Sequence, residues 1–503
     1  MGELFKKEAP MSEQSPAIAG NTRPPRHLPT ALRARAEYVA SVYREQLPHR
    51  ERDVQRARYY YDTLKRLLRF IVEPGKRVLQ VYCDIGHLLA AVEPSRGLGL
   101  HSSRGHLEIA RKNHPHLEFR EADPHDFVVD ETFDYVLLVN AIGDIVDVQA
   151  TLQRCRTVMT PESRLVIVWT NYLWQPIFKL AERLGLKSRQ PAINWFSPAD
   201  VENLLTLTGF EKVKENQALV MPVNIPLVSW FLNRILARIP PFHKLCYIRS
   251  IVARPLYIRE DTDQFSVSIV VPCKNEAGNI QAAVERIPQM GRHTEIIFCD
   301  DKSTDGTADK VREMQRRYPE KDIKLVEGPG ISKSFNVWAG FDAAQGDILM
   351  ILDADLTTIP EELPYFFDAI ASGRGEFING SRMVYPMAED AMKPLNVLGN
   401  KLFSLIFSYL LGQRIKDTLC GTKVLWRKDY ERMKSLRGSW GVTDRWGDYE
   451  LIFGAAKLNL KIIDLPVHYL ERVYGETKMT RRFKNAAIMA RMCLAALSKL
   501  RFA

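Results

Sequence analysis

The sequence predicts an α/β protein built from two doubly wound domains, each with a parallel β-sheet covered by helices. Two observations predict this fold class. Apolar segments of strand length alternate with segments of helical periodicity twice along the 503 residues, and a stretch rich in proline and aromatic residues separates the two series. Hydrophobic residues make up 46% of the chain and charged residues 26%, the ordinary composition of globular domains.

The first series occupies residues 38–220. A helical pattern over 57–71 is followed by apolar strand segments with helices between them, and this alternation is typical of a parallel sheet. The predicted strands are 77–82, 97–100, 133–139 and 164–169, and the predicted helices are 106–113, 148–158 and 198–207. Residues 1–37 are rich in proline, serine and charge, and we expect them to form a disordered basic arm.

The segment 221–264 is predicted to link the two domains. Its apolar residues recur at helical spacing and predict an amphipathic helix with basic residues on its other faces. They are Val228, Phe231, Leu232, Ile235, Leu236 and Ile239. Two interpretations stay open: the helix packs between the domains, or it lies in a membrane interface.

The second series occupies residues 265–478. Its predicted strands are 267–272, 295–299, 323–326 and 347–352, and the helices between them are 277–290, 306–318 and 332–345. A further apolar helix over 396–411 is expected either to be buried or to line a path for a lipid chain. Residues 479–503 predict a cationic amphipathic C-terminal helix, which either touches an anionic surface or docks on its own domain.

Charge, cysteine content and hydropathy exclude several classes of protein. Lysine and arginine exceed the acids by 70 to 60, but the cations gather near the termini and are not interleaved with aromatic residues, so no nucleic-acid partner is expected. Seven scattered cysteines without a CxxC pair favour a reducing compartment. No apolar run reaches 18 residues and no signal peptide is recognised, so we expect a cytoplasmic protein without a transmembrane helix.

The strongest chemical signal follows the predicted strand 347–352. There Asp353 and Asp355 stand two residues apart, a spacing that on a strand places both carboxylates on one side. Open α/β sheets bind ligands at the carboxyl ends of their strands. Two carboxylates held together favour a hard divalent cation, Mg²⁺ or Mn²⁺, which would also neutralise a diphosphate leaving group. The alternative is an ordinary cap between a strand and a turn.

Polar turns at the ends of two other predicted strands complete an ordered array of motifs. The array is VVPCKNE, CDDKSTDGT, GDILMILDADL, NGSR, DTLCGTK and RVYGETK, between residues 266 and 478. It resembles the family 2 glycosyltransferases of GT-A fold, and within them the polyprenyl-phosphate branch that includes dolichol-phosphate mannose synthases. The resemblance implies a GT-A fold for the second domain and sugar transfer from a nucleotide-sugar donor.

The resemblance also implies roles for individual residues. Nucleotide and donor binding fall to Pro272, Lys274, Glu276, Cys299 through its backbone, Asp301, Ala354 and Thr477. Metal binding falls to Asp353, Asp355 and Thr357. Catalysis falls to the same two aspartates, to a candidate base and to cations that grip phosphate: Asp448, Arg382, Arg472 and Lys478.

The acceptor decides what else the reaction needs. In-line attack on the anomeric carbon would invert its configuration. A polyprenyl phosphate is already anionic and needs cations to position it, whereas a hydroxyl acceptor needs a general base, for which Asp448 and Glu450 are the candidates. With a lipid phosphate as acceptor, these two carboxylates would organise the loop around them.

The first domain carries a second resemblance. Residues 74–87, PGKRVLQVYCDIGH, resemble the first motif of class I S-adenosylmethionine-dependent methyltransferases, which implies a Rossmann-like fold. That motif normally has an acid and three glycines, which let the backbone approach the cofactor. Here Gln80 replaces the acid, Tyr82 and Asp84 replace two glycines, and Gly86 is the one that is left.

The second strand of the first domain departs from the methyltransferase pattern as well. It ends in Leu100-His101-Ser102, where an acid that binds the ribose hydroxyls would be expected, although Asp123 matches the position on the adenine side. The sequence therefore predicts a degenerate methyltransferase-like domain kept for scaffolding or partner binding. S-adenosylmethionine is not expected as a cofactor.

The leading hypothesis is a metal-dependent inverting glycosyltransferase. It would move a sugar from a nucleotide-sugar donor to a polyprenyl phosphate in cell-surface glycan synthesis, in peripheral contact with the cytoplasmic face of a membrane. The alternatives are a bifunctional glycosyltransferase and methyltransferase, a glycosyltransferase that acts on a glycan hydroxyl, and a scaffold without catalytic activity. The intact pair Asp353 and Asp355 argues against the scaffold.

Overall fold

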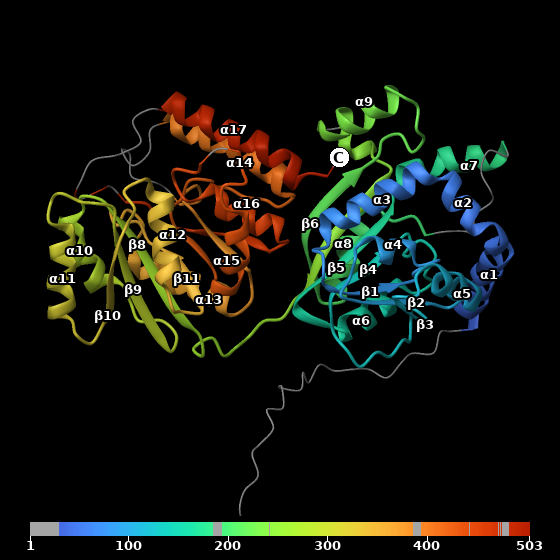
Figure 1. Ribbon diagram of the computed structural model, residues 1–503, viewed down its shortest axis with the longest axis horizontal. Helices are drawn as coiled ribbons and strands as arrows, with labels where there is room; N and C mark the ends of the chain where they lie inside the picture. The colour runs from blue at the N-terminus through green and yellow to red at the C-terminus, as the bar shows by residue number, and fades with distance from the viewer. Residues whose placement is uncertain are drawn as a thin grey trace, which may run out of the picture.

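The computed structural model describes residues 30–184, 194–240, 242–385, 394–441, 443–470, 472, 474 and 482–502. It confirms the predicted fold class. Two mixed α/β domains, each with a seven-stranded sheet and helices packed on it, stand side by side (Figure 1).

The first sheet has the strand order β3-β2-β1-β4-β5-β7-β6, in which every strand runs parallel except β7. The strands are β1 (Arg77–Val81), β2 (Arg96–His101), β3 (Glu118–Glu121), β4 (Phe133–Val139), β5 (Met159–Thr170), β6 (Phe210–Ala218) and β7 (Ile248–Pro255). The helices are α1 (Thr30–Gln46), α2 (Arg50–Arg56), α3 (Arg58–Ile71), α4 (His87–Ala91), α5 (Arg104–Asn113), α6 (Val148–Thr157), α7 (Gln175–Arg183), α8 (Pro198–Leu207) and α9 (Val228–Arg234). The strand order reverses between β1 and β4, which is where folds of this class bind ligands.

The structure corrects the predicted boundary between the first domain and the linker. Strand β7 lies inside the segment 221–264, yet it pairs with both β5 and β6 and all of its residues are buried. The first domain therefore extends to Pro255. The apolar pattern missed this strand because Arg249 and Arg254 interrupt it, and their burial is possible because they pair with Glu215 and Glu211.

Two other predicted segments also differ from the structure. The single amphipathic helix expected between Val228 and Ile239 is divided into α9 and the short 3-10 helices η3 (Leu236–Arg238) and η4 (Phe242–Leu245). Residues 30–37, assigned to the disordered arm, belong to α1. The other 29 residues of that arm lie outside the described part of the chain.

The second sheet has the order β10-β9-β8-β11-β13-β12-β14, and β13 runs antiparallel to both of its neighbours. Its strands are β8 (Ser266–Cys273), β9 (His293–Asp300), β10 (Asp322–Glu327), β11 (Ile348–Ile351), β12 (Phe377–Ser381), β13 (Lys423–Trp426) and β14 (Ile462–Pro466). The helices are α10 (Ala277–Arg286), α11 (Thr307–Arg317), α12 (Lys333–Ala343), α13 (Leu363–Ala371), α14 (Pro394–Leu411), α15 (Arg427–Met433), α16 (Tyr449–Lys457) and α17 (Arg482–Leu500).

Helix α17 docks on its own domain, which favours one of the two interpretations of the C-terminal segment. Its residues Met492 and Ala496 are buried in the core that α14 and α16 also line. The chain then reaches the first domain. Arg501 donates to the carbonyl of Glu215 at 3.1 Å, and the ring of Phe502 lies 5.8 Å from that of Phe70.

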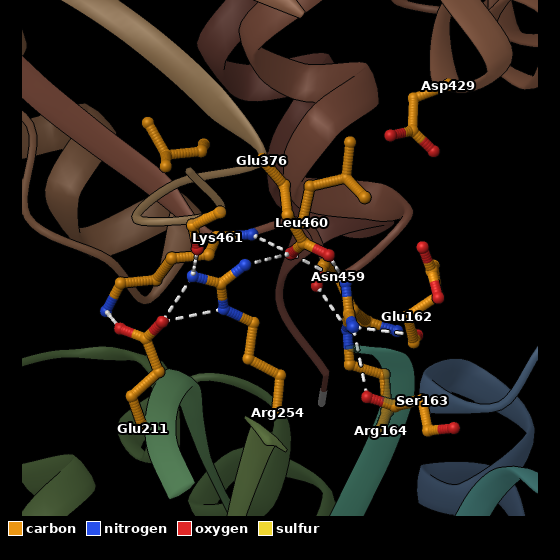
Figure 2. Close-up of polar contacts among 12 residues, drawn as sticks. Glu162, Ser163, Arg164, Glu211, Arg254, Glu376, Asp429, Asn459, Leu460 and Lys461 are labelled. Carbon is orange, nitrogen blue, oxygen red and sulfur yellow. Dashed lines mark hydrogen bonds and ion pairs between the residues drawn. The ribbon is translucent and has the colours of Figure 1, made fainter. Parts of the chain in front are cut away.

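A buried charge cluster joins the two domains (Figure 2). Arg164 on β5 donates to both carboxylate oxygens of Glu376, which immediately precedes β12, at 2.8 Å each. Arg254 on β7 lies 3.7 Å from the same carboxylate and also donates to Glu211. The backbone N–H of Lys461 completes the set by donating to Glu376 at 2.8 Å. One carboxylate of the second domain therefore satisfies two arginines of the first.

No helix in the described part of the chain is both long enough and apolar enough to cross a membrane.

Removal of the carboxylate of Glu376 tests whether the cluster holds the domains together. Glu376→Ala leaves Arg164, a buried cation, without a carboxylate, so we expect a loss of about 3–5 kcal/mol in stability, the usual cost of removing one partner of a buried ion pair. Scanning calorimetry measures it as a lower thermal midpoint. Lys428→Ala is the matched control: it removes the exposed pair with Glu162 across the same interface and should cost about 1 kcal/mol or less. Equal losses in both variants would contradict the assignment.

Candidate functional site

The carboxyl ends of β8, β9 and β11 bring three polar turns together at one edge of the second sheet. Strand β8 lies between the other two, so the turns that follow the three strands are neighbours. The backbone N–H of Asp301, after β9, donates to the carbonyl of Cys273 at 2.9 Å, and that of Leu352, after β11, donates to Val270 at 3.0 Å. The predicted edge is therefore present in the structure.

Asp353 and Asp355 lie in a turn and not on the strand, because β11 ends at Ile351. The turn is closed by a hydrogen bond from the N–H of Leu356 to the carbonyl of Asp353 at 3.1 Å. The alternation of a strand therefore does not explain how the two side chains are placed. Thr357 donates its hydroxyl hydrogen to Asp355 at 2.9 Å, so it supports one carboxylate of the pair.

Two cations contact the aspartate pair. Lys333, at the start of α12, lies 2.5 Å from Asp353. Arg472 lies 2.5 Å from Asp355 and 3.7 Å from Glu276, so it spans the ends of β11 and β8. The site therefore consists of three carboxylates, those of Asp353, Asp355 and Glu276, that are contacted by two cations.

The electrostatics of the first contact are strong. Burial alone would raise the pKa of Asp353, but the charge and the hydrogen bond of Lys333 outweigh it and hold the pKa below its usual value. Burial alone would lower the pKa of Lys333, because it disfavours the charged form of a base, but attraction by Asp353 and Asp448 holds that pKa above its usual value. Both groups therefore stay charged at neutral pH.

The residues assigned to the nucleotide surround the same edge. Glu276 and Asp301 are buried, and Lys274 lies 3.3 Å from Asp301. Glu276 accepts a hydrogen bond from Asn279 at 2.9 Å, and Asp301 accepts one from the N–H of Gly330 at 2.8 Å.

The remaining nucleotide positions are placed by the strands themselves. Pro272 and Cys299 are paired neighbours in β8 and β9, and the Cys299 carbonyl accepts a hydrogen bond from Asn336 at 2.7 Å. Ala354 is buried between the two aspartates. Thr477 and Lys478 lie outside the described residues, so their predicted roles stay predictions.

Arg382, predicted to grip phosphate, holds a buried carboxylate in the structure. Its Nε and Nη2 donate to the two oxygens of Asp417 at 2.8 and 2.9 Å. Burial raises the pKa of Asp417, but the paired guanidinium outweighs it and holds the pKa below its usual value. The fork of Arg382 is therefore engaged in fixing the loop before β13, and its role toward phosphate stays a prediction.

The two candidate bases face different surroundings. Asp448, just before α16, lies 3.4 Å from the buried Lys423, and burial raises its pKa although Lys423 and Lys333 oppose the rise. Glu450 lies two residues further along the chain, in α16, and accepts a hydrogen bond from the N–H of Gly438 at 3.2 Å. Because residues two apart on a helix do not share a face, only Asp448 is brought toward Asp353.

Sequence reasoning missed Lys333 and Lys423. Lys333 stands in the motif Ser-Lys-Ser at the start of a predicted helix, a position where the helix N-terminus and a cation both favour an anion. Lys423 ends the motif DTLCGTK, and its burial beside Asp448 could not be foreseen from the spacing. Asp444 was missed as well: it accepts from the N–H groups of Trp446, Tyr449 and Glu450 and so fixes the loop that carries Asp448.

The described residues contain no group of three or more histidine, cysteine, aspartate or glutamate side chains arranged to hold a metal ion. Asp353 and Asp355 offer two carboxylates close together in one turn. They are hard oxygen donors of the kind that Mg²⁺ and Mn²⁺ prefer, and Mg²⁺ is commonly held by one or two carboxylates together with substrate phosphates and water.

The first domain keeps a crevice at the point where its strand order reverses. The crevice has a volume of about 200 Å³, and its lining includes five tyrosines, two histidines and two aspartates. The backbone keeps positive φ at all three glycine positions of the methyltransferase motif: 64° at Tyr82, 52° at Asp84 and 78° at Gly86. The turn therefore has the geometry that glycines favour, although two of them are replaced.

The replaced side chains fill the space that the glycines would leave. The ring of Tyr82 lies 4.6 Å from that of His101, which stands at the end of β2. Arg50 donates to both oxygens of Asp84, and this pairing outweighs burial and lowers the pKa of Asp84 to about 2. Gln80, in place of the motif's acid, is buried. Asp123, the retained acid, is hydrogen-bonded to His125 at 2.6 Å.

Comparisons with known proteins agree with this arrangement. Residues 268–448 match the family model "Glycosyl transferase family 2", and residues 51–215 match the model of a methyltransferase domain. A dolichyl-phosphate hexose transferase of Haloferax volcanii is 30% identical over 235 residues, which cover 45% of this chain and 94% of that protein. The chain therefore belongs to glycosyl transferase family 2, with a methyltransferase-like domain before the glycosyltransferase domain.

Other known proteins are similar to parts of the chain. A dolichol-phosphate mannosyltransferase of Pyrococcus furiosus is 37% identical over 120 residues, 24% of this chain and 33% of that protein. The chain thus spans about a third of that relative's length. Among solved structures, an S-adenosylmethionine-dependent methyltransferase of Thermotoga maritima, a possible histamine N-methyltransferase, is similar at 16% identity and a TM-score of 0.35, over 43% of this chain and 99% of that one.

Asp144 gives the first-domain crevice a pH dependence that can be measured. Burial raises the pKa of Asp144 to about 6, although a hydrogen bond from Tyr43 at 2.7 Å opposes the rise. An unfolded aspartate has a pKa of about 3.9, so between these values the folded chain binds more protons and stability falls as pH rises. We expect Asp144→Asn to match the unsubstituted chain near pH 3 and to exceed it by about 3 kcal/mol at pH 7.

Thermal midpoints of both proteins across this pH range measure the effect. Tyr43→Phe is the complementary variant: it removes a hydrogen bond that favours the charged carboxylate, so the fall in stability should become larger and extend to higher pH. A difference between Asp144→Asn and the unsubstituted chain that is the same at every pH would contradict the raised pKa.

Proposed function

We propose that the chain is an inverting glycosyltransferase that moves a sugar from a nucleotide-sugar donor to a polyprenyl phosphate, in cell-surface glycan synthesis. The convergence of Asp353, Asp355 and Glu276 with Lys333 and Arg472 at one sheet edge carries the proposal. This group of side chains connects the end of β8, where the nucleotide is expected to bind, with the end of β11, where the diphosphate is expected to bind. The names of the relatives, which are transferases acting with dolichol phosphate, support the choice of acceptor.

The reaction is proposed to depend on a divalent metal, Mg²⁺ or Mn²⁺. Asp353 and Asp355 would hold it, with Thr357 orienting Asp355 through its hydrogen bond. A bound dication supplies stabilisation of the negative charge that develops on the leaving diphosphate. What supports this part of the proposal is that the two carboxylates are hard oxygen donors that lie together at the end of a strand.

The basic side chains of the protein would also stabilise the negative charge of the diphosphate. Lys333 and Arg472 already contact the two aspartates, so a diphosphate that binds beside these carboxylates has two cations within reach. Cations placed before the reaction stabilise charge on the leaving group without reorganising during it. The acceptor attacks the anomeric carbon from the face opposite the diphosphate, which inverts the configuration.

A second candidate acceptor is a glycan hydroxyl, and Asp448 favours it. This carboxylate is buried near Lys333, and its raised pKa brings it closer to the range in which a general base works at neutral pH. Glu450 lacks this placement. With a phosphate acceptor, Asp448 has no proton to remove and serves to hold Lys423.

The first domain is proposed to have no methyltransferase activity. S-adenosylmethionine does not fit its crevice, because the side chains of Tyr82 and Asp84 occupy the positions where glycines would let the backbone approach the cofactor. The carboxylate of Asp84 is also neutralised by Arg50. A bifunctional enzyme is therefore the weaker of the alternatives.

The protein is proposed to work in the cytoplasm, peripherally at the inner face of a membrane. All seven cysteines are free and buried, which supports a reducing compartment. A polyprenyl-phosphate acceptor is itself embedded in a lipid bilayer, so its reaction with a soluble donor takes place at the bilayer surface.

Loss of a DxD carboxylate tests the main proposal. The full chain is incubated with a panel of labelled sugar nucleotides, Mg²⁺ or Mn²⁺ and polyprenyl phosphate, and lipid product is recovered by organic extraction. Asp355→Ala should lower the rate by about 100-fold or more, the usual cost of removing a preorganised electrostatic group at a reaction centre. Asp309→Ala, an exposed carboxylate on α11, is the matched control and should leave the rate unchanged. Unchanged turnover in Asp355→Ala would refute the site, and methylated product on addition of S-adenosylmethionine would refute the inactive first domain.

The role of Asp448 distinguishes the two acceptors. With polyprenyl phosphate as acceptor, Asp448→Asn should keep most of the rate and its pH profile, because no proton is removed from the nucleophile. With a hydroxyl acceptor, the same variant should lose about 100-fold in kcat and the rise of rate with pH. Glu450→Gln, a buried carboxylate that faces Gly438, is the control for loop stability.

A further inference from the structure

Helix α14 exposes a second apolar stripe. Phe403, Phe407 and Leu410 face the core, as expected of a buried helix. Leu398, Leu402 and Leu405, spaced at i, i+4 and i+7, form another stripe, and their side chains are 57–70% exposed. Since one stripe already satisfies the core, folding does not require the outer one.

The first domain carries two similar features. On α7, Ile177 and Leu180 are exposed and are followed by the exposed Leu184 at helical spacing. On α9, Val228 and Phe231 are exposed and are followed by the exposed Ile235 at helical spacing. Isolated apolar side chains on a surface need no explanation, but aligned stripes on three helices do.

Hydrogen bonds between these segments make the features neighbours. Trp174 and Asn171, before α7, donate to the carbonyls of Leu245 and Lys244 in η4. The hydroxyl of Tyr409 on α14 donates to the carbonyl of Arg238 in η3, and α14 packs on α17. Figure 1 shows α7, α9, α14 and α17 along the same upper side of the molecule, across both domains. We refer to the exposed side of these four helices as the apolar face.

The charges around the apolar face are positive with one exception in the described residues. Lysine or arginine occurs on every one of its helices, including Lys179, Arg234, Lys401 and Arg491, which are exposed. Within the described residues of α7, α9, η3, η4, α14 and α17, Glu182 is the single acidic side chain. Apolar side chains flanked by cations are the pattern of helices that lie in an anionic lipid interface.

We propose that the apolar face docks on an anionic lipid bilayer, and that the methyltransferase-like domain serves as a membrane-docking module for the glycosyltransferase domain. The inference rests on the proposed function for its purpose, because a lipid acceptor must be reached from the bilayer surface, but its evidence is independent of the catalytic site. It assigns the first domain a role that needs no methyl donor.

The face also connects to the catalytic edge. Asn400 on α14 donates to the buried carboxylate of Asp417 at 2.8 Å, and Asp417 holds Arg382. The helix that presents the leucine stripe is therefore fixed to the same loop as an arginine predicted to bind phosphate. A bilayer that contacts α14 would bring lipid phosphates close to that loop.

Vesicle binding by the full chain tests the proposal, without donor or acceptor present. Sedimentation with vesicles of phosphatidylcholine alone is compared with vesicles that contain an equal share of phosphatidylglycerol. We expect binding to the anionic vesicles that weakens with salt, and about tenfold weaker binding for Phe231→Glu and for Leu180→Glu, because each change places a charge in the bilayer interface. Tyr365→Glu, on the exposed surface of α13 away from this face, is the matched control and should bind as the unsubstituted chain does.

Each outcome has a defined meaning. Unchanged thermal midpoints in the variants would show that lost binding is not lost folding. Phe231→Glu should transfer sugar to a water-soluble short-chain polyprenyl phosphate at the normal rate, so a failure of transfer in every variant would count against the proposed function and not against docking. Absence of vesicle binding, or a concentration-dependent dimer that Phe231→Glu dissociates, would overturn the proposal and make the face a contact between copies of the chain.

Discussion

The arrangement of the whole molecule depends on the charge of Glu376. This carboxylate belongs to the second domain, but the groups that it satisfies, Arg164 and Arg254, are buried in strands of the first. A buried cation without a partner is far more costly than an exposed one. The two domains are therefore complementary parts of one electrostatic unit. The cluster acts on their relative orientation together with other contacts, such as those of Arg501 with Glu215 and of Tyr409 with Arg238, and α7 and α9 lie level with α14 and α17.

The catalytic edge follows the same principle on a smaller scale. Lys333 and Arg472 occupy the space between carboxylates that would otherwise repel one another. The pairing preorganises the cations near the place where a diphosphate would bind. A site of this kind favours a phosphorylated donor over a neutral sugar.

The sequence predicted the elements whose pattern is local. The strands β1, β4 and β8 and the helices α3, α6 and α8 match their predicted ranges within a residue or two, because buried parallel strands read as continuous apolar runs and amphipathic helices as periodic ones. Strand β7 was missed because two arginines break its pattern, and they are tolerated only through partners distant in sequence. The same distinction applies to the candidate site. Asp353 and Asp355 were recognised from their local motif, whereas Lys333 and Lys423 contact the site through tertiary structure that residue spacing does not encode.

The cluster at the interface also bears on how the chain is made. The first domain is complete once Pro255 has been synthesised, but the carboxylate that neutralises Arg164 is more than a hundred residues further along. Until that segment emerges from the ribosome, the guanidinium group of Arg164 in a nascent first domain lacks its carboxylate partner, whereas Arg254 already has Glu211. Domains fold largely in the order of their synthesis, so the first one waits in an incomplete state with a cationic surface.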